Sequence, residues 1–173
     1  TAQTKALFTV QYPMAWFDLR GKTDSFGLNY FDNAAKATLA QRTLAINLSG
    51  TYPQYGANNW GLTAADGPTG YTVWGGPPAT GNVDGSVVPT APGGSIAFTP
   101  RQSVDALRYM QSTYPTTYKK YGFVDAFNPH TNWTSSIVLG IDVGMMLLAA
   151  ENARSGNIWS SFAQSAVAQN ALV

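Results

Sequence analysis

Apolar residues recur every three or four positions along residues 30–47, and polar or small residues fill the positions between them. This spacing predicts an amphipathic helix over 30–47. Asn29 precedes the stretch, where an N-cap residue is favoured, and Gly50 lies just beyond its end. The residues of the predicted stripe are Phe31, Ala34, Ala35, Thr38, Leu39, Arg42, Ala45 and Ile46.

A second helix is predicted to begin after Thr99, whose hydroxyl suits an N-cap. Pro100 would take the first helical position, where its missing N–H costs nothing, and Pro115 limits the helix. Its inward-facing residues would be Val104, Leu107 and Met110.

The third predicted helix covers 141–154 and is apolar around most of its circumference, so we expect it to be buried on nearly all sides. Gly156 would end it. A fourth helix, from 158 to about 172, follows almost at once, so the last two should form an antiparallel hairpin. Four such helices do not close a core. We therefore expect the chain to pack against helices from a second chain, a missing half or an oligomer partner.

Residues 50–100 are rich in Gly and Pro and show neither helical nor strand periodicity. A loop of this length within a compact domain is usually either functional or disordered. Its aromatic residues argue against disorder, so we interpret the loop as part of a functional site. These residues are Tyr52, Tyr55, Trp60, Tyr71 and Trp74.

Charged residues make up only 11% of the 173 residues, and the net charge is +1. Without a Lys/Arg cluster there is no electrostatic drive for nucleic-acid binding, so that partner is excluded, and no apolar run is long enough to imply a membrane partner. The chain has no cysteine and a single histidine, His130, so it lacks the ligands of a Cys/His zinc site, and we expect no cofactor. A surface so poor in charge suits a neutral polar ligand.

Three aspartates stand among apolar, aromatic or glycine residues: Asp66 in "TAADGPTGY", Asp125 in "YGFVDAFNP" and Asp142 in "LGIDVGMM". Such surroundings desolvate a carboxylate and raise its pKa toward that of a general acid, so all three are catalytic candidates. Two alternatives stay open. Asp66 suits an Asx turn, because Asp-Gly-Pro favours turns, and Asp142 suits an N-cap of the third helix.

Aromatic rings stack on sugar rings, and Asn, Asp and Arg side chains hydrogen-bond sugar hydroxyls, so the chain has both halves of carbohydrate recognition. The alternative is that some of these aromatics fill the core beneath the loop. Trp159, at core spacing on a helix, is expected to pack rather than bind. The candidates are Trp60, Trp74, Trp133, Tyr55, Tyr71, Asn58, Asn128 and Arg20.

Several motifs follow one another in order along nearly the whole chain: "LFTVQYPMAWFDLRG", "YFDNAAKATLAQR", "YGANNWGLTAADGPTGY", "DGSVVPTAPGGSIAFTP", "YGFVDAFNP" and "GIDVGMMLLAAENARSGNIW". Together they resemble the glycoamylase-like domain of bacterial glycoside hydrolases, the family that includes endo-β-1,2-glucanases and, more distantly, a domain of cyclic β-1,2-glucan synthases. The long blocks around Trp60 and Asp125 make a chance similarity improbable.

The resemblance implies an all-α fold, an (α/α)6 barrel whose C-terminal half is residues 1–173 and whose active-site mouth is lined by the long loop. It implies hydrolysis of β-glucan, most simply β-1,2-linked, by two carboxylates, with the general-acid glutamate in the upstream half. It also implies a periplasmic or extracellular bacterial protein. The expected partners are an oligo- or polysaccharide and the N-terminal half of the same barrel, from the same gene or a separate chain.

The resemblance also implies the roles of individual residues, although Val10 and Met14 stand where its pattern leads us to expect histidine. The implied catalytic residues are Asp66, Asp125 and Asp142. The implied or inferred substrate ligands are Asp18, Arg20, Asn58, Trp60, Tyr71, Trp74, Asn128 and Trp133.

Two functional alternatives stay open. One is a transglycosylase or phosphorolytic relative, as the likeness to the synthases allows, and the other is a non-catalytic glycan-binding protein. The first residues, "TAQTKALFTV", contain neither an initiator Met nor a targeting pattern, so we expect the chain to be a cleaved or trimmed piece.

Overall fold

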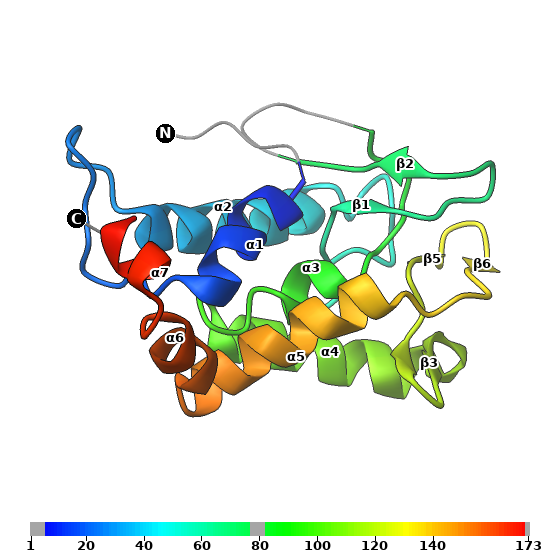
Figure 1. Cartoon of the computed structure of the whole chain (residues 1–173). Coiled ribbons are helices and arrows are strands. Elements are labelled where there is room, and N and C mark those ends of the chain that lie inside the picture. Colours follow the sequence, from blue (N-terminus) through cyan, green and yellow to red (C-terminus); the bar gives the residue numbers. More distant parts are fainter. Residues whose placement is uncertain (1–5, 77–81, 172–173) are drawn as a thin grey trace.

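The computed structural model describes residues 6–76 and 82–171, which fold into a layer of helices joined by long irregular connections (Figure 1). Three short antiparallel ribbons accompany the expected helices, so the fold is helix-rich rather than purely helical. The helices are α1 (Phe8–Trp16), α2 (Tyr30–Asn47), α3 (Thr90–Gly93), α4 (Pro100–Thr113), the 3-10 helix η1 (Pro115–Thr117), α5 (Gly140–Arg154), α6 (Asn157–Phe162) and α7 (Ala166–Asn170). The ribbons pair β1 (Ala64–Ala65) with β2 (Thr72–Val73), β3 (Tyr118–Lys119) with β4 (Gly122–Phe123), and β5 (Phe127–Asn128) with β6 (Trp133–Thr134).

The long helices run in two opposite directions. In Figure 1, α1 and α5 run from right to left, whereas α2 and α4 run from left to right. The irregular residues 48–76 and 82–89 and the connection 114–139 therefore lie at the end of the layer where α2 and α4 end, and residues 94–99 lead back to the start of α4 at the other end, where the connections 17–29 and 155–156 also lie. This arrangement decides which of the predicted site residues can meet.

The helix α2 (Tyr30–Asn47) has the predicted bounds, and its predicted N-cap is confirmed, because the Asn29 side chain accepts a hydrogen bond from the Asp32 N–H. The predicted apolar stripe is only partly buried, since Leu39 and Ile46 are exposed. The buried face of α2 includes polar as well as apolar side chains: Asn33, Ala34, Thr38, Gln41 and Ala45.

The helix α4 begins at Pro100, as predicted, but the predicted hydroxyl cap is wrong. The Thr99 hydroxyl turns back to the Ser95 carbonyl and to Ser103 instead of capping the helix. Of the three predicted inward residues, Met110 is buried and the other two are half-buried.

The helix α5 (Gly140–Arg154) is not buried on nearly all sides, which corrects the prediction for the described chain. Ile141 and Leu147 are 64% and 68% exposed, because the described helices cover one side of α5 only. The side that packs against α1, α3 and α6 buries Met145, Ala149 and Asn152.

The predicted fourth helix is two short helices, α6 and α7, separated by a break at residues 163–165, and its predicted end at Leu172 lies outside the described residues. Trp159 on α6 is buried, as expected. The helix α1 (Phe8–Trp16) was not predicted, because Pro13 lies inside it and its apolar residues do not form one stripe.

The loop after α2 is fixed to the helical layer by the Gln41 side chain, which pairs with the backbone of Leu62 as a neighbouring β-strand would. The Gln41 amide donates to the Leu62 carbonyl (2.8 Å) and accepts from the Leu62 N–H (2.8 Å). A backbone bridge between Val87 and Phe127 then joins this long loop to the later connection. Both connections are therefore held together at the end of the layer where α1 and α5 begin.

Candidate active site

A cavity of about 620 Å³ opens at this end, between the first turn of α1, the β1–β2 ribbon and the first turn of α5. Its wall is mostly apolar and aromatic, and Asp142 is the carboxyl group in that wall. The lining residues are Phe8, Thr9, Tyr12, Ala64, Ala65, Tyr71, Leu139, Ile141 and Asp142.

Asp142 lies in the first turn of α5, and Leu139 is the N-cap, so the alternative of Asp142 as N-cap is wrong. Burial, together with the neighbouring Asp125 carboxyl group, raises the pKa of Asp142 to about 8. The Thr90 hydroxyl donates to the Asp142 carbonyl (3.1 Å) and fixes the start of the helix. The raised pKa favours the protonated form of Asp142 at neutral pH.

Asp125 is only 2% exposed and lies two residues before β5. Its Oδ2 accepts a hydrogen bond from the Asp66 N–H (2.6 Å), and its own N–H donates to the Ile137 carbonyl (3.1 Å). Its Oδ1 is buried and has no partner with hydrogen-bond geometry. Burial is the main cause of the raised pKa of Asp142, and the neighbouring Asp125 adds to it.

Asp66 is half-buried and follows β1 directly. Its carboxylate accepts a hydrogen bond from the Ser135 hydroxyl (2.9 Å), so it contacts the end of β6 rather than closing an Asx turn. The three predicted catalytic aspartates are therefore brought together, from a loop, a ribbon and a helix that are far apart in the sequence.

The predicted aromatic ligands divide into two groups. Tyr71 is 73% exposed and lines the cavity, so its ring is available to a ligand. Trp60 and Trp74 are 0% and 1% exposed and lie in the core beneath the loop, so their predicted stacking role is corrected: neither offers a face to a sugar. Tyr55 is also buried, and its hydroxyl donates to the Ser86 carbonyl.

Three other predicted ligands lie away from this cavity. Trp133 and Asn128 line a separate hollow of about 350 Å³ beside the β5–β6 ribbon. Asn128 is 1% exposed, and its amide is occupied by backbone and side-chain partners around the turn, including the His130 N–H (3.0 Å), so its predicted substrate contact is corrected to a structural one. Asn58 is exposed and is not part of the cavity wall.

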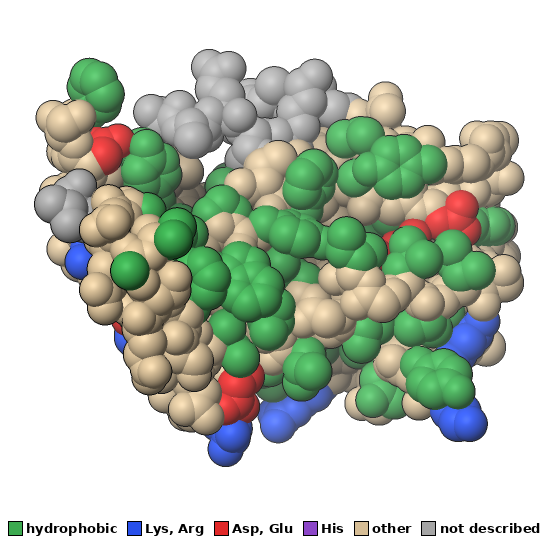
Figure 2. Space-filling view, viewed as in Figure 1, with side chains coloured by type: hydrophobic (Ala, Val, Ile, Leu, Met, Phe, Trp, Pro, Cys, Tyr) green, Lys and Arg blue, Asp and Glu red, His purple; other side chains and the backbone are tan. Residues whose placement is uncertain are grey.

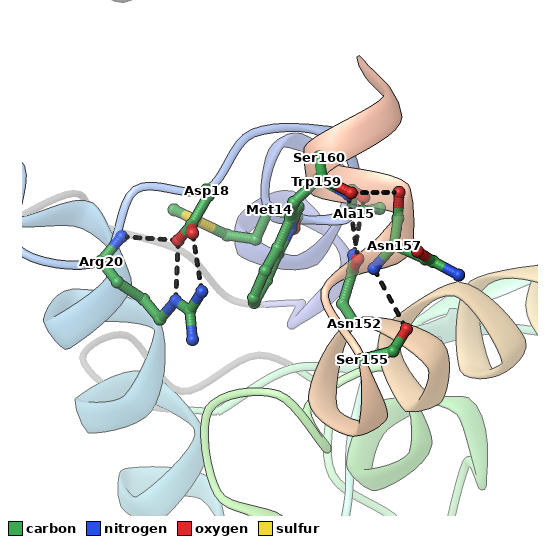
Figure 3. A network of polar contacts seen from close by, with 9 residues as sticks. All are labelled: Met14, Ala15, Asp18, Arg20, Asn152, Ser155, Asn157, Trp159 and Ser160. Atoms are coloured by element: carbon green, nitrogen blue, oxygen red, sulfur yellow. Dashed lines mark hydrogen bonds and ion pairs between the residues drawn. The ribbon is translucent and has the colours of Figure 1, made fainter. Parts of the chain in front are cut away.

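Asp18 and Arg20 lie beyond the other end of α1, so the structure does not bring them to the cavity. Nine helical residues at 1.5 Å each separate the two places by roughly 13 Å. The Arg20 guanidinium makes two hydrogen bonds to the Asp18 carboxylate (2.7 and 2.8 Å) and lies 4.6 Å from the centre of the Trp159 ring. Figure 3 shows this pair beside the contacts that join α1, α5 and α6.

Two positions without a predicted role belong to the site. Tyr12 lines the cavity, and burial and the charge of Asp142 raise its pKa. Ser135 is the donor to Asp66. Only the "QYP" and "WTSS" motifs mark them in the sequence, and neither has helical or strand periodicity. Val10 and Met14, where histidine was expected, are buried and do not line the cavity.

Within residues 6–76 and 82–171, no three His, Asp or Glu side chains are grouped so that they could hold a metal ion. None of the helices described there has the length and apolar character required to cross a membrane.

The cavity has an aromatic and apolar wall with the carboxyl group of Asp142 in it, a combination suited to binding a neutral polar ligand and to acid–base chemistry on it. The comparison with known families agrees. The chain belongs to the Glycoamylase family, whose model, described as "Putative glucoamylase", matches residues 1–166.

Three of the similar proteins are named as hydrolases of β-1,2-glucans or their oligosaccharides. The chain is 32% identical over 157 residues to an exo-β-1,2-glucooligosaccharide sophorohydrolase (non-reducing end) of Parabacteroides distasonis, covering 90% of this chain and 21% of the relative. An endo-β-1,2-glucanase from Chitinophaga pinensis, solved with sophorotriose and glucose, superposes with a TM-score of 0.87 at 31% identity, over 96% of this chain and 40% of that one. A β-1,2-glucanase from P. distasonis gives 0.89 at 31% identity, over 97% and 24%. The chain thus spans less than half the length of each of these relatives.

Proposed function

We propose that this chain is part of a glycoside hydrolase that cleaves β-1,2-linked glucan. The observation that carries the proposal is Asp142, a carboxyl group kept protonated by its surroundings and open to an aromatic cavity of sugar-binding size. The names of the relatives support the substrate class.

In the proposed reaction, Asp142 donates its proton to the glycosidic oxygen as the bond to the anomeric carbon breaks. A water molecule adds to that carbon and loses one proton to a second carboxylate, so the products are two shortened glucans with free hydroxyls. We place the second carboxylate on the upstream half, as the resemblance implies. This reverses the role first expected of the upstream glutamate, because a carboxyl group with a pKa of about 8 is a proton donor at neutral pH.

We further propose that the upstream half covers the exposed apolar face of this chain and completes an (α/α)6 barrel. Figure 2 shows hydrophobic side chains gathered over the face that carries α1 and α5. This face borders the cavity, so the missing helices would form its opposite wall. The exposed residues that support the proposal are Phe8, Tyr71, Val73, Leu139, Ile141 and Leu147.

The other predicted substrate ligands have different roles in this proposal. Tyr71 would stack on a glucosyl unit in the cavity, and Trp133 and Asn58 would meet only a longer glucan that extends beyond it. Asp18 and Arg20 would have no substrate contact, because they lie at the opposite end of α1. Export to the periplasm or beyond fits a polysaccharide substrate.

The test is product analysis with the complete protein, that is, this chain with its upstream half. Sophorose and shorter glucans released from β-1,2-glucan in water support hydrolysis, and no release with β-1,3- or β-1,4-glucan supports the linkage. Sugar phosphates formed only in phosphate buffer, or elongated oligosaccharides, indicate the phosphorolytic or transglycosylase alternative. Binding without any turnover indicates a glycan-binding protein and contradicts the proposal.

A further inference from the structure

The hollow of about 350 Å³ beside the β5–β6 ribbon has the chemistry of a sugar site. Its wall combines the aromatic side chains of Trp133 and Tyr114 with the uncharged polar side chains of Gln54, Asn132 and Thr116. None of the described residues that line it carries a charge. Its volume lies at the small end of the range for ligand sites, roughly 300 to 1,000 Å³. An aromatic face beside uncharged hydrogen-bonding groups suits a neutral ligand rich in hydroxyls.

The hollow and the candidate active-site cavity are separate but neighbouring sites. Within the described chain they have no lining residue in common. Ala65 in the cavity wall belongs to a buried cluster with Trp74 and Ala126, and Trp133 in the wall of the hollow packs against that same cluster. A polymer bound at the hollow would therefore be kept near the cavity.

The turn of the β5–β6 ribbon, residues 129–132, is fixed by its own hydrogen bonds. The Asn128 Oδ1 accepts from the N–H groups of His130 (3.0 Å) and Thr131 (3.1 Å), and its amide donates to the preceding loop. Asn132 has a φ of 58°, a left-handed conformation that Asn adopts more easily than most residues. This part of the wall is therefore formed in advance, and a ligand does not have to supply the free energy to order it.

Gln54 brings an unsatisfied acceptor to the wall. Its backbone carbonyl accepts from the Asn59 amide (2.8 Å), which fixes the position of the residue. Its side-chain Oε1 is buried and has no hydrogen-bond partner among the described residues. Since a buried acceptor without a donor is unfavourable, a hydroxyl donor in the hollow is the kind of group that would satisfy it. The hollow thus favours a hydroxyl-bearing ligand over an apolar one.

We propose that this hollow is a second glucan-binding site, which holds a part of the polymer outside the cavity. Trp133 offers the stacking face, and Gln54 and Asn132 bind the hydroxyls. The inference rests on the proposed function for the identity of the glucan. The site takes no part in bond cleavage. It adds affinity for long chains, because a chain held at one site raises its effective concentration at the other.

The kinetic test uses the complete protein and fills the hollow with Thr116→Arg, a change at an exposed residue of its wall. The KM for long β-1,2-glucan, divided by the KM for the shortest β-1,2-oligosaccharide that the protein cleaves, should rise roughly 3- to 10-fold, the loss of one stacking face. Thr131→Arg is the matched control, because Thr131 is exposed on the adjacent turn and does not line the hollow. An equal ratio in the two variants overturns the inference.

A binding test reads the site without turnover. The indole N–H signal of Trp133 is followed by NMR while long β-1,2-glucan is added to complete protein that carries Asp142→Asn, which slows cleavage. Glucan should shift this signal, and the shift should be lost when Thr116→Arg is added but kept with Thr131→Arg. A Trp133 signal that does not respond to glucan overturns the inference, including the case in which the upstream half covers the hollow.

The two tests separate this inference from the proposed function. If the unaltered protein does not cleave β-1,2-glucan but glucan shifts the Trp133 signal, the proposed function is wrong and the second site stands. If β-1,2-glucan is cleaved and neither the Trp133 signal nor the KM ratio responds, the function stands and the second site is wrong.

Discussion

Asp142 links the protonation state of the cavity to the stability of the fold. A carboxyl group in water loses its proton near pH 4, whereas Asp142 in the folded chain keeps its proton up to about pH 8. Between these values the folded state binds more protons than the unfolded state, so the free energy of unfolding falls as the pH rises. The site thus costs the most stability at alkaline pH, where Asp142 has to become charged.

We predict that Asp142→Asn makes the free energy of unfolding less dependent on pH between about 4 and 8. The amide has the size of the carboxyl group but does not titrate. Urea unfolding of both proteins at pH 5 and pH 8 measures the difference, with Asp32→Asn as a control on an exposed helical aspartate. Parallel pH dependence in the Asp142 and Asp32 variants would contradict the raised pKa.

Trp60 and Tyr71 come from the same loop but face opposite ways, and the consequences of removing them should differ. Trp60→Ala should lower the free energy of unfolding by about 3 to 5 kcal/mol, because it empties a fully buried site. Tyr71→Ala should change it by less than about 0.5 kcal/mol and instead raise KM by roughly 3- to 10-fold, the loss of one stacking face. Thermal unfolding and steady-state kinetics distinguish the two.

The helices α1, α5 and α6 are joined by one amide. The Asn152 Nδ2 donates to the Ala15 carbonyl (2.9 Å), its Oδ1 accepts from the Trp159 N–H (3.2 Å), and the Trp159 indole donates to Met14 (2.6 Å). All three bonds satisfy groups at helix ends (Figure 3). The contacts fix the far end of α1, and through it the direction of the first turn that lines the cavity.

We predict that Asn152→Ala lowers the free energy of unfolding by about 2 to 4 kcal/mol, because it leaves a buried carbonyl and a buried N–H without partners. Asp18→Ala at the same end should cost less than about 1 kcal/mol, since the Asp18–Arg20 pair is exposed to solvent. Urea denaturation compares them, and equal losses would show that the Asn152 amide is not what joins the helices.

Sequence periodicity could identify α2 and α5 because each has a long regular apolar pattern and a distinct end signal. It could not identify α1, because Pro13 lies inside the helix and its apolar residues are not set against a polar face. It also misplaced Trp60 and Trp74. Aromatic residues in a Gly/Pro-rich loop give the same sequence pattern whether they are buried beneath the loop or exposed on its surface. Only the path of the backbone decides between these two positions.

The three aspartates could be selected from the sequence because each is a lone carboxylate in an apolar motif. Their different tasks could not, since these depend on which atoms meet. Asp66 acts on Asp125 through its backbone N–H, a group every residue but proline possesses, and no sequence pattern marks such a contact. The distance of Asp18 from the cavity was equally hidden, because it follows from the unpredicted α1.

In the part of the chain that the structure describes, one side of the helical layer is exposed to solvent. We predict that Leu147→Glu leaves the fold of this chain unchanged but weakens its association with the upstream half by at least ~10-fold, because it buries a charge in the proposed interface. Arg108→Glu on α4, also a change of charge at an exposed position, is the control. Titration of the separately produced halves gives the affinity, and equal affinities for the two variants would contradict this interface.

The pairing of the Gln41 amide with both backbone groups of Leu62 has a kinetic consequence. The irregular segment after α2 can detach from the layer at Leu62 only if both hydrogen bonds to the Gln41 side chain break, so the Leu62 amide proton should exchange with solvent more slowly than that of a free loop. The wall that carries Ala64 and Ala65 would then have its final shape before any glucan arrives, and substrate would not have to supply the free energy to order it.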